Sequence, residues 1–152
     1  MGENQNPAHR PIEELDLFVL FEQVADWVWD QVEMWKPSHQ ATIGHQLIRA
    51  ADSVGANLVE GDRRYGDADG INFFIIAKAS ARETRLWLRR ALKRALVETD
   101  EAAQQIDKLT RATKLLNLLI TYRRQRGKRP NVAREVRATY NGSSDPFVGA
   151  DV

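Results

Sequence analysis

The stretch of sequence that determines the fold reads QLIRAADSVGANLVEG and runs from Gln46 to Gly61. Apolar residues recur in and just before it at steps of three and four, which places them on one face of an α-helix. These residues are Ile43, Leu47, Ala51, Val54 and Leu58. We predict a helix that begins near Ser38 or at Thr42, where the side chain can serve as an N-cap, and ends near Gly61.

Two further amphipathic segments flank this helix in the sequence. The first runs from about Ile12 to Trp35 and stops before Pro37, because proline disfavours helical geometry in the residue that precedes it. The segment 61–70 is polar and rich in glycine and aspartate, which predicts a loop. After it, the apolar periodicity predicts a long helix from about Asp69 to Leu96.

A fourth helix is predicted after Thr99, with Thr99 as its cap, and it should fray between Arg123 and Gly127. Four amphipathic helices joined by short loops predict an all-α, up-down-up-down four-helix bundle. We divide the chain into a flexible N-terminus (1–11), the bundle (12–124) and a mostly disordered basic C-terminal tail (125–152).

The composition limits the class of protein. The chain has 152 residues, of which 43% are hydrophobic, enough for the core of one domain. It has no cysteine, which excludes disulfides and thiolate metal sites. Its longest apolar run is too short to span a bilayer, and the N-terminus lacks the apolar stretch of a signal peptide. We therefore predict a cytoplasmic protein with no membrane partner.

The charge is unevenly distributed although the formal net charge is only +1. Residues 1–40 carry eight acids and two bases, whereas residues 78–94 carry seven bases and one acid. Residues 108–137 add ten bases and one acid. An asymmetry of this kind permits self-association or binding to a polyanion.

The strongest candidate site is a row of cations in the predicted third helix. Its members are spaced by four, three, four and four residues and fall in one narrow arc, and they are Lys78, Arg82, Arg85, Arg89 and Lys93. Such a row predicts contacts to the phosphates of a nucleic acid. The alternative is a solvated helix face, or pairing with the acidic first helix of the same or a neighbouring chain.

Basic residues near the end of the fourth helix form a second candidate. Arg123, Arg124 and Arg126 begin a basic C-terminal segment, and such segments commonly bind nucleic acid without sequence preference. The alternative interpretation is a solubilising end of the chain.

A line of polar residues follows the otherwise apolar second helix. Arg49, Ser53, Asn57 and Glu60 are spaced by four, four and three residues. Polar side chains at such positions are usually satisfied by hydrogen bonds inside a packed interface. We predict an inter-helix or inter-subunit polar network, with Glu60 meeting an arginine of the third helix, and the alternative is an exposed edge. Trp29 lies off the main apolar stripe of its helix and is a candidate for a subunit contact.

The sequence offers no arrangement of residues for catalysis. His39 and His45 are six residues apart and face different sides of a helix, so they do not have the spacing of metal ligands. There is no glutamate–histidine pair of the di-metal bundle type and no glycine-rich phosphate loop. We therefore expect no enzyme activity, no catalytic residue, no metal, no cofactor and no small-molecule substrate.

The opening stretch resembles a known bacterial four-helix-bundle family. The matching features are Arg49-Ala50-Ala51, Ser53-Val54, and the pattern in which Asn57 is followed by Glu60-Gly61. Further along, Arg64, the Phe73-Phe74 pair and the segment from Ala77 to Glu83 resemble the start of the family's third helix. The family comprises proteins encoded in intervening sequences of large-subunit ribosomal RNA genes and the accessory variability determinants of diversity-generating retroelements. The resemblance covers roughly residues 15–122.

The resemblance implies an up-down bundle that assembles into a homopentameric ring, and it implies no catalytic residues. It also implies that retroelement members bind nucleic acid and a reverse transcriptase through basic surfaces. Our first hypothesis is a homo-oligomer that binds RNA or DNA through the cationic row and the basic C-terminal segment. The alternative is a protein–protein scaffold of the ribosomal RNA intervening-sequence type with no nucleic-acid role.

Overall fold

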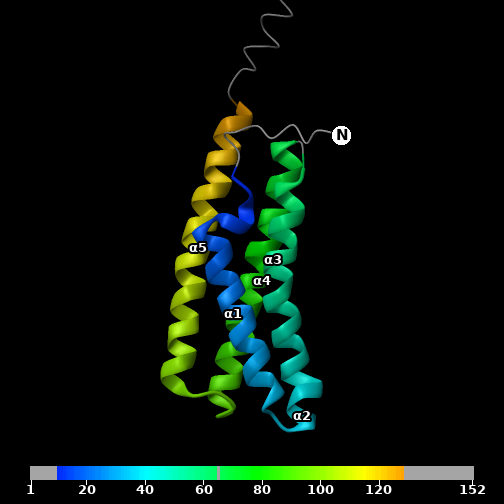
Figure 1. The fold of residues 1–152 in the computed structure, drawn as a ribbon, viewed down its shortest axis with the longest axis vertical. Helices are drawn as coiled ribbons and strands as arrows, with labels where there is room; N and C mark the ends of the chain where they lie inside the picture. Colours follow the sequence, from blue (N-terminus) through cyan, green and yellow to red (C-terminus); the bar gives the residue numbers. More distant parts are fainter. Residues whose placement is uncertain (1–9, 65, 129–152) are drawn as a thin grey trace, which may run out of the picture.

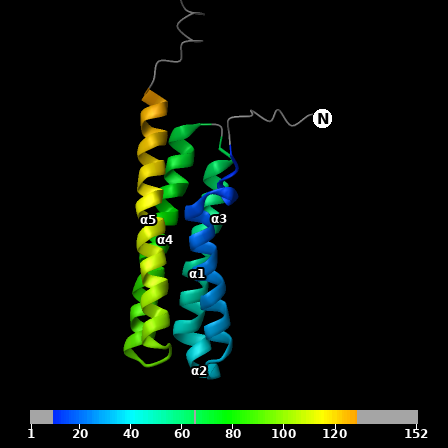
Figure 2. The ribbon, with the colours of Figure 1, turned by 60° about the vertical axis from the view of Figure 1, so that its left-hand side comes forward.

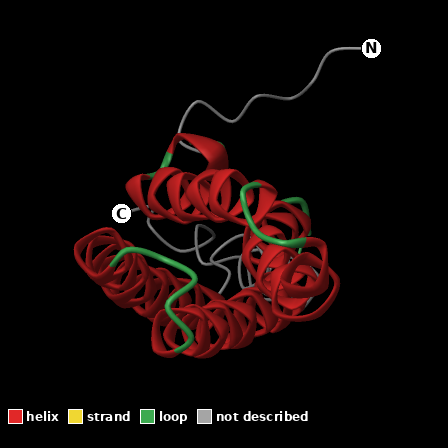
Figure 3. Cartoon of the chain, turned by 90° about the horizontal axis from the view of Figure 1, so that it is seen from below, coloured by secondary structure: helices red, strands yellow, loops and turns green. Residues whose placement is uncertain are grey.

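The computed structural model describes residues 10–64 and 66–128, and within them it contains helices and short connections but no strand. Four long helices alternate in direction along the chain (Figures 1 and 2): α1 (Asp16–Glu33), α3 (His45–Asp62), α4 (Asp67–Lys93) and α5 (Thr99–Lys128). Along the long axis, the helices surround a common centre (Figure 3). The predicted four-helix bundle is confirmed. Our assignments for residues 1–9 and 129–152 lie outside the described residues.

The core is built from the residues that share the inner face of each helix. α1 packs on α3 and α5, and α4 also packs on α3 and α5, so that α1 and α4 occupy opposite corners. Leu47, Leu58, Phe74, Leu88 and Leu116 are completely buried between them. Burial of each such side chain contributes about 1.5–3 kcal/mol, which is how the periodic pattern specifies the bundle. Within the described residues, no helix is both long and apolar enough to cross a membrane.

The first predicted helix is interrupted near its start. A short 3₁₀ turn, η1 (Ile12–Glu14), comes first, and Leu15 has an extended backbone before α1 begins. Ile12 is buried, and its backbone N–H donates a hydrogen bond to Oδ2 of Asp62 on α3 at 3.1 Å. This hydrogen bond to α3 turns the chain away from the axis of α1. The prediction of a single helix that begins at Ile12 is therefore wrong at this end.

The second predicted helix begins earlier than expected and contains an irregular turn. Pro37 is the first residue of α2 (Pro37–His39), which suits a residue with a fixed φ and no N–H. A π-helical segment, η2 (Gln40–Gly44), then leads into α3. A Cβ added to Gly44 would lie 2.7 Å from Cγ1 of Val32, so glycine allows α1 to approach this segment closely.

The connection between α3 and α4 is much shorter than the predicted loop. Helix α3 continues through Gly61 to Asp62, and α4 starts at Asp67, so both Gly61 and Gly70 lie inside helices. Their backbones are in contact, because a Cβ on Gly61 would lie only 2.8 Å from the carbonyl oxygen of Gly70. Gly61 and Gly70 therefore serve close helix packing, and the connection is confined to the few residues between Asp62 and Asp67.

Helix α4 ends three residues before the predicted Leu96. Ala95 adopts a left-handed φ of 57°, and the Leu96 N–H donates to the Ala91 carbonyl oxygen, which closes the helix end. The predicted cap of the fourth helix is also displaced by one residue. The Glu98 carboxylate, not Thr99, accepts the N–H groups of Asp100 and Glu101, and these hydrogen bonds lower the pKa of Glu98.

Substitution of Gly61 by alanine should destabilise the bundle. The new methyl group would collide with the backbone of α4 and with the Phe74 ring, both 2.8 Å away, so α3 and α4 would have to separate. We expect the free energy of unfolding in urea to fall by about 1–3 kcal/mol. Gly66→Ala is the matched control, because a Cβ there meets nothing within 4 Å. Equal effects of the two substitutions would contradict this account of the glycine contact.

Candidate nucleic-acid interface

The predicted row of cations lies on the side of α4 that is next to α5. We call it the cationic stripe, and it comprises Lys78, Arg82, Arg85, Arg89 and Lys93. The Arg85 guanidinium donates a hydrogen bond to Oγ1 of Thr110 on α5, which fixes the direction in which the stripe faces. Lys78 and Arg85 are half-buried, and the other three members of the stripe are exposed.

The cationic stripe is not neutralised by the rest of the bundle. Among residues 10–64 and 66–128, none of its five members forms an ion pair. From Lys78 to Lys93 the stripe covers 15 helical steps, which corresponds to about 22 Å at 1.5 Å per residue. Five cations held in line over this distance repel one another and favour an extended anionic partner.

The structure places Arg123 in the interior, away from the surface where we expected it. It is only 6% exposed, and its Nη2 lies 2.8 Å from Oδ1 of Asp62. Its guanidinium also stacks over the Phe74 ring, at 5.3 Å from the ring centroid. Because its charge is paired with Asp62 and its guanidinium is buried against Phe74, Arg123 stabilises the bundle and does not present a cation to a ligand.

The other two predicted cations of this segment also differ in whether their charge is neutralised: Arg126 is paired and Arg124 is not. Arg126 forms an ion pair with Asp67 at the start of α4, so part of its charge is neutralised. This hydrogen bond is the main reason why the pKa of Asp67 lies below its ordinary value of 3.8. Arg124 is exposed and forms no ion pair within the described part of the chain. Helix α5 continues to Lys128, so residues 125–128, which we assigned to the tail, are helical.

The polar line of α3 divides into three parts. Asn57 donates to the Ser53 carbonyl and hydroxyl oxygens, and Oγ of Ser53 lies 3.0 Å from Oγ of Ser80 on α4. This is an inter-helix polar network like the one predicted. Glu60 instead pairs with Arg64 in the following turn, so its expected partner on the third helix is wrong. Arg49 is exposed and takes no part in the network.

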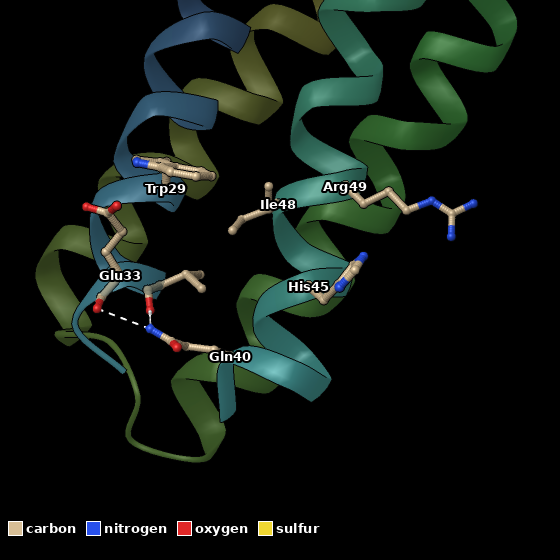
Figure 4. Close-up of a pocket in the computed structure, with 7 residues that line it drawn as sticks. Trp29, Glu33, Gln40, His45, Ile48 and Arg49 are labelled. Carbon is tan, nitrogen blue, oxygen red and sulfur yellow. Dashed lines mark hydrogen bonds between the residues drawn. The ribbon is translucent and has the colours of Figure 1, made fainter. Parts of the chain in front are cut away.

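Sequence reasoning missed a groove between α1 and α3 (Figure 4). It has a volume of about 370 Å³ and is lined by Trp29, Val32, Glu33, Gln40, His45, Ile48 and Arg49. The Gln40 amide donates to the carbonyl oxygens of Val32 and Glu33, which closes one end of the groove against α1. The off-stripe position of Trp29 was the one signal of this site in the sequence, because the π-helical register of η2 cannot be predicted from periodicity.

The exposed face of α1 is acidic. Its carboxylates are spaced by four, four and three residues, and they are Glu22, Asp26, Asp30 and Glu33. Asp52 on α3 faces the same region, and its pKa is raised by partial burial and, to a smaller extent, by the charge of Asp26. The bundle therefore has an acidic corner at α1 and a cationic corner at α4. Within the described residues, no group of three histidine, aspartate or glutamate side chains could hold a metal ion.

Fold and surface together define an all-helical bundle whose distinctive features are an acidic face and a cationic face on opposite corners. Residues 13–118 match the family described as 23S rRNA-intervening sequence protein, and the chain belongs to this family. A solved structure from Bacteroides thetaiotaomicron, described as a protein of unknown function from the S23 ribosomal protein family, has the same fold. Its TM-score is 0.63 at 23% identity, and the match covers 68% of this chain and 97% of that one. No curated protein matches the sequence significantly.

Replacement of Arg123 by methionine should destabilise the protein. Methionine has a similar length but leaves the Asp62 carboxylate, which is 12% exposed, without its buried cation. Loss of one partner of a buried pair typically costs about 3–5 kcal/mol, and we expect a fall of this size in the free energy of unfolding. Arg124→Met, on the exposed side of the same helix, is the control. A neutral effect of Arg123→Met would show that the pair does not stabilise the bundle.

The Asp67–Arg126 pair should make stability depend on pH in a defined direction. Because the folded pKa of Asp67 is lowered, the pair stabilises the protein fully above the ordinary value of 3.8 and loses its effect as the pH falls through the folded pKa. Asp67→Asn should therefore be less stable than the wild type at neutral pH, and the difference should vanish in stronger acid. Urea denaturation at both pH values tests this, with Asp69→Asn as the control in the same turn. A difference that persists in acid would assign the effect to something other than the charge.

Proposed function

We propose that this chain is a non-enzymatic, homo-oligomeric bundle that binds RNA or DNA through the cationic stripe on α4. The observation that carries the proposal is the absence of any ion pair to the five cations of the stripe among the described residues. A helix that holds unneutralised cations in one line provides a track for phosphates, and release of counterions drives such binding. Arg124 adds an exposed cation from α5, whereas Arg123 does not belong to the interface.

Binding of this kind reads the phosphate backbone and not the base sequence. The stripe consists of lysine and arginine only, so its own members offer no aromatic side chain on which unpaired bases could stack. We therefore expect affinity that depends steeply on salt and weakly on nucleotide sequence. The reverse transcriptase partner and the pentameric ring implied by the retroelement resemblance stay predictions.

A second candidate function is a protein scaffold without a nucleic-acid role. The observation that favours it is the acidic face of α1, whose carboxylates follow a spacing similar to that of the stripe on the opposite corner. The acidic face of one subunit would then pair with the stripe of its neighbour. High salt should dissociate such an assembly, whereas in the nucleic-acid hypothesis high salt releases the ligand and leaves the oligomer intact.

Charge reversal in the stripe should weaken nucleic-acid binding. Arg82→Glu with Arg89→Glu alters two exposed members of the stripe, and Arg63→Glu with Arg111→Glu makes the same charge change at exposed positions elsewhere. Fluorescence anisotropy of a labelled single-stranded RNA, titrated at several salt concentrations, measures both affinity and its salt dependence. For single strands, log affinity falls with log salt concentration with a slope of about −0.7 per phosphate contact. Loss of two contacts in the stripe variant should therefore reduce the magnitude of this slope by about 1.4.

The control double variant should retain clearly more affinity than the stripe variant. If both double variants lose affinity equally, the effect reflects net charge alone and the assigned surface is wrong. If the wild-type protein does not bind RNA or DNA even at low salt, the nucleic-acid function is excluded and the scaffold function remains.

A further inference from the structure

Helix α5 exposes a second apolar face, which begins where α5 lies beside α1 (Figure 1). We call it the α5 strip, and it comprises Leu115, Leu118 and Tyr122. Leu118 is 66% exposed and Tyr122 is 57% exposed. The bundle already buries a different face of α5, with Leu109, Leu116 and Ile120, so the strip is not needed for the core. An exposed apolar strip of this kind marks a site of protein contact.

A groove between α1 and α5 adjoins one end of the strip. Its volume is about 540 Å³, and it is lined by Asp16, Val19 and Leu20 of α1 and by Arg111, Lys114 and Leu115 of α5. The three α5 residues of the groove come seven, four and three residues before Leu118, whereas Tyr122 comes four residues after it. Leu118 therefore lies between the groove and an exposed aromatic side chain, with Lys114 and Tyr122 each about 6 Å away along the helix axis.

This arrangement is complementary to itself. When two copies place their α5 helices antiparallel with a two-fold axis at Leu118, each position before Leu118 faces the position equally far after it in the other copy. Tyr122 of one copy then lies opposite Lys114 of the other, at the mouth of its groove. An aromatic ring suits this place, because it can pack on the apolar walls and also accept the Lys114 ammonium group against its face.

The charges around Leu118 favour the antiparallel contact. The cations Arg111 and Lys114 come before Leu118, and the corresponding positions after it hold Gln125 and Tyr122, which are uncharged. The two-fold contact therefore places each cation opposite a neutral side chain. A parallel contact would place Lys114 against Lys114 of the other copy, and the repulsion would oppose it.

The other charged groups near the strip add little to this balance. Arg126 lies over the Tyr122 ring, at 5.8 Å from its centroid, and Asp67 neutralises it within the same chain. At the other end of the strip, one turn before the groove, Asp107 and Lys108 carry opposite charges. The groove itself contains one carboxylate, so one unbalanced cation per copy is left in the contact.

The exposed apolar face of α4 would be a less suitable occupant of this site. Its largest exposed side chain is Leu86, and four arginines but only one carboxylate, Glu83, lie within four residues of it. Within four residues of Leu118, the only charged residue is Lys114. The face of α4 would therefore bring cations towards the cations of the groove, whereas a second α5 strip brings neutral side chains.

We propose that the α5 strip and the adjoining groove form a two-fold contact between two copies of this chain, with Leu118 on the axis and Tyr122 of each copy seated at the groove of the other. This inference rests on the homo-oligomeric part of the proposed function and names the residues of one contact. The contact is isologous and closes at two copies, so a larger assembly requires a second, different contact. It uses α5 and α1 and not the cationic stripe of α4.

Single cysteines test this geometry directly, because the chain contains no cysteine. A residue on a two-fold axis meets its own copy, so Leu118→Cys should form a disulfide-linked dimer under mild oxidation. Tyr122→Cys alone should not, because its two copies would be offset by about 12 Å along the helices, and a disulfide spans Cα atoms only about 7 Å apart. A mixture of Tyr122→Cys and Lys114→Cys should form the mixed dimer. Leu86→Cys is the matched control, since it replaces an exposed leucine on another helix.

Sedimentation velocity of the full chain over a range of concentrations measures the association itself. We expect the wild type to associate, and Leu118→Asp to weaken the association about tenfold or more, because it places two carboxylates together at the centre of the contact. Leu86→Asp is the control and should leave association unchanged. Circular dichroism verifies that every variant is folded.

Three outcomes would overturn the proposal. The first is a wild-type chain that stays monomeric at all concentrations, and if this monomer binds RNA, the nucleic-acid part of the proposed function survives alone. The second is an oligomer that is unchanged in Leu118→Asp, which would leave the homo-oligomeric part intact but assign its contact to another face. The third is cross-linking of Leu118→Cys that is no faster than that of Leu86→Cys or Tyr122→Cys, which would contradict a two-fold axis at Leu118.

Discussion

Arg123 is a charged side chain at a position where a charge is costly unless every part of it is satisfied. Asp62 on α3 neutralises it, the Phe74 ring of α4 covers its guanidinium, and the same Asp62 accepts the N–H of Ile12 ahead of α1. One guanidinium on α5 thereby connects the start of the bundle, α3 and α4 at a single end. An apolar residue would tolerate small sliding of the helices, but a buried ion pair with these hydrogen bonds has one satisfactory geometry. We infer that this interaction sets the relative axial positions of the helices.

The faces that α4 exposes depend on those positions. The contact between Gly61 and Gly70 brings α3 and α4 close together near the same end, and the Ser53–Ser80 hydrogen bond continues the close packing along the bundle. On the other side of α4, the hydrogen bond from Arg85 to Thr110 relates α4 to α5. With α4 fixed on both sides, its remaining circumference divides into a cationic part next to α5 and an apolar part that faces outwards. The interior thus determines which side chains of α4 are presented together.

The bundle could be predicted because helix periodicity involves residues that are close in the sequence. The candidate site depends on contacts between residues that are far apart in the sequence. Apolar residues that recur at steps of three and four were enough to identify four helices. The same spacing of the cations placed the cationic stripe on one face. The role of Arg123 could not be predicted, because Asp62 lies 61 residues earlier and belonged to a segment that we interpreted as a loop. Gly61 and Gly70 were misinterpreted for the same reason, since glycine serves turns and close helix packing equally well. The groove at Trp29 needs the π-helical turn of η2, and no sequence pattern marks that turn.

The near-zero net charge acquires a physical meaning from this division of surfaces. A strongly basic subunit would bind a polyanion well but would repel other copies of itself, so assembly would have to overcome that repulsion. In this chain the acids are concentrated on α1 and the bases on α4 and α5, and the formal net charge is +1. Neighbouring copies can therefore approach with little overall repulsion while each still presents an unneutralised cationic stripe. Self-association and polyanion binding make opposite demands on net charge, and separation of the charges onto different helices satisfies both.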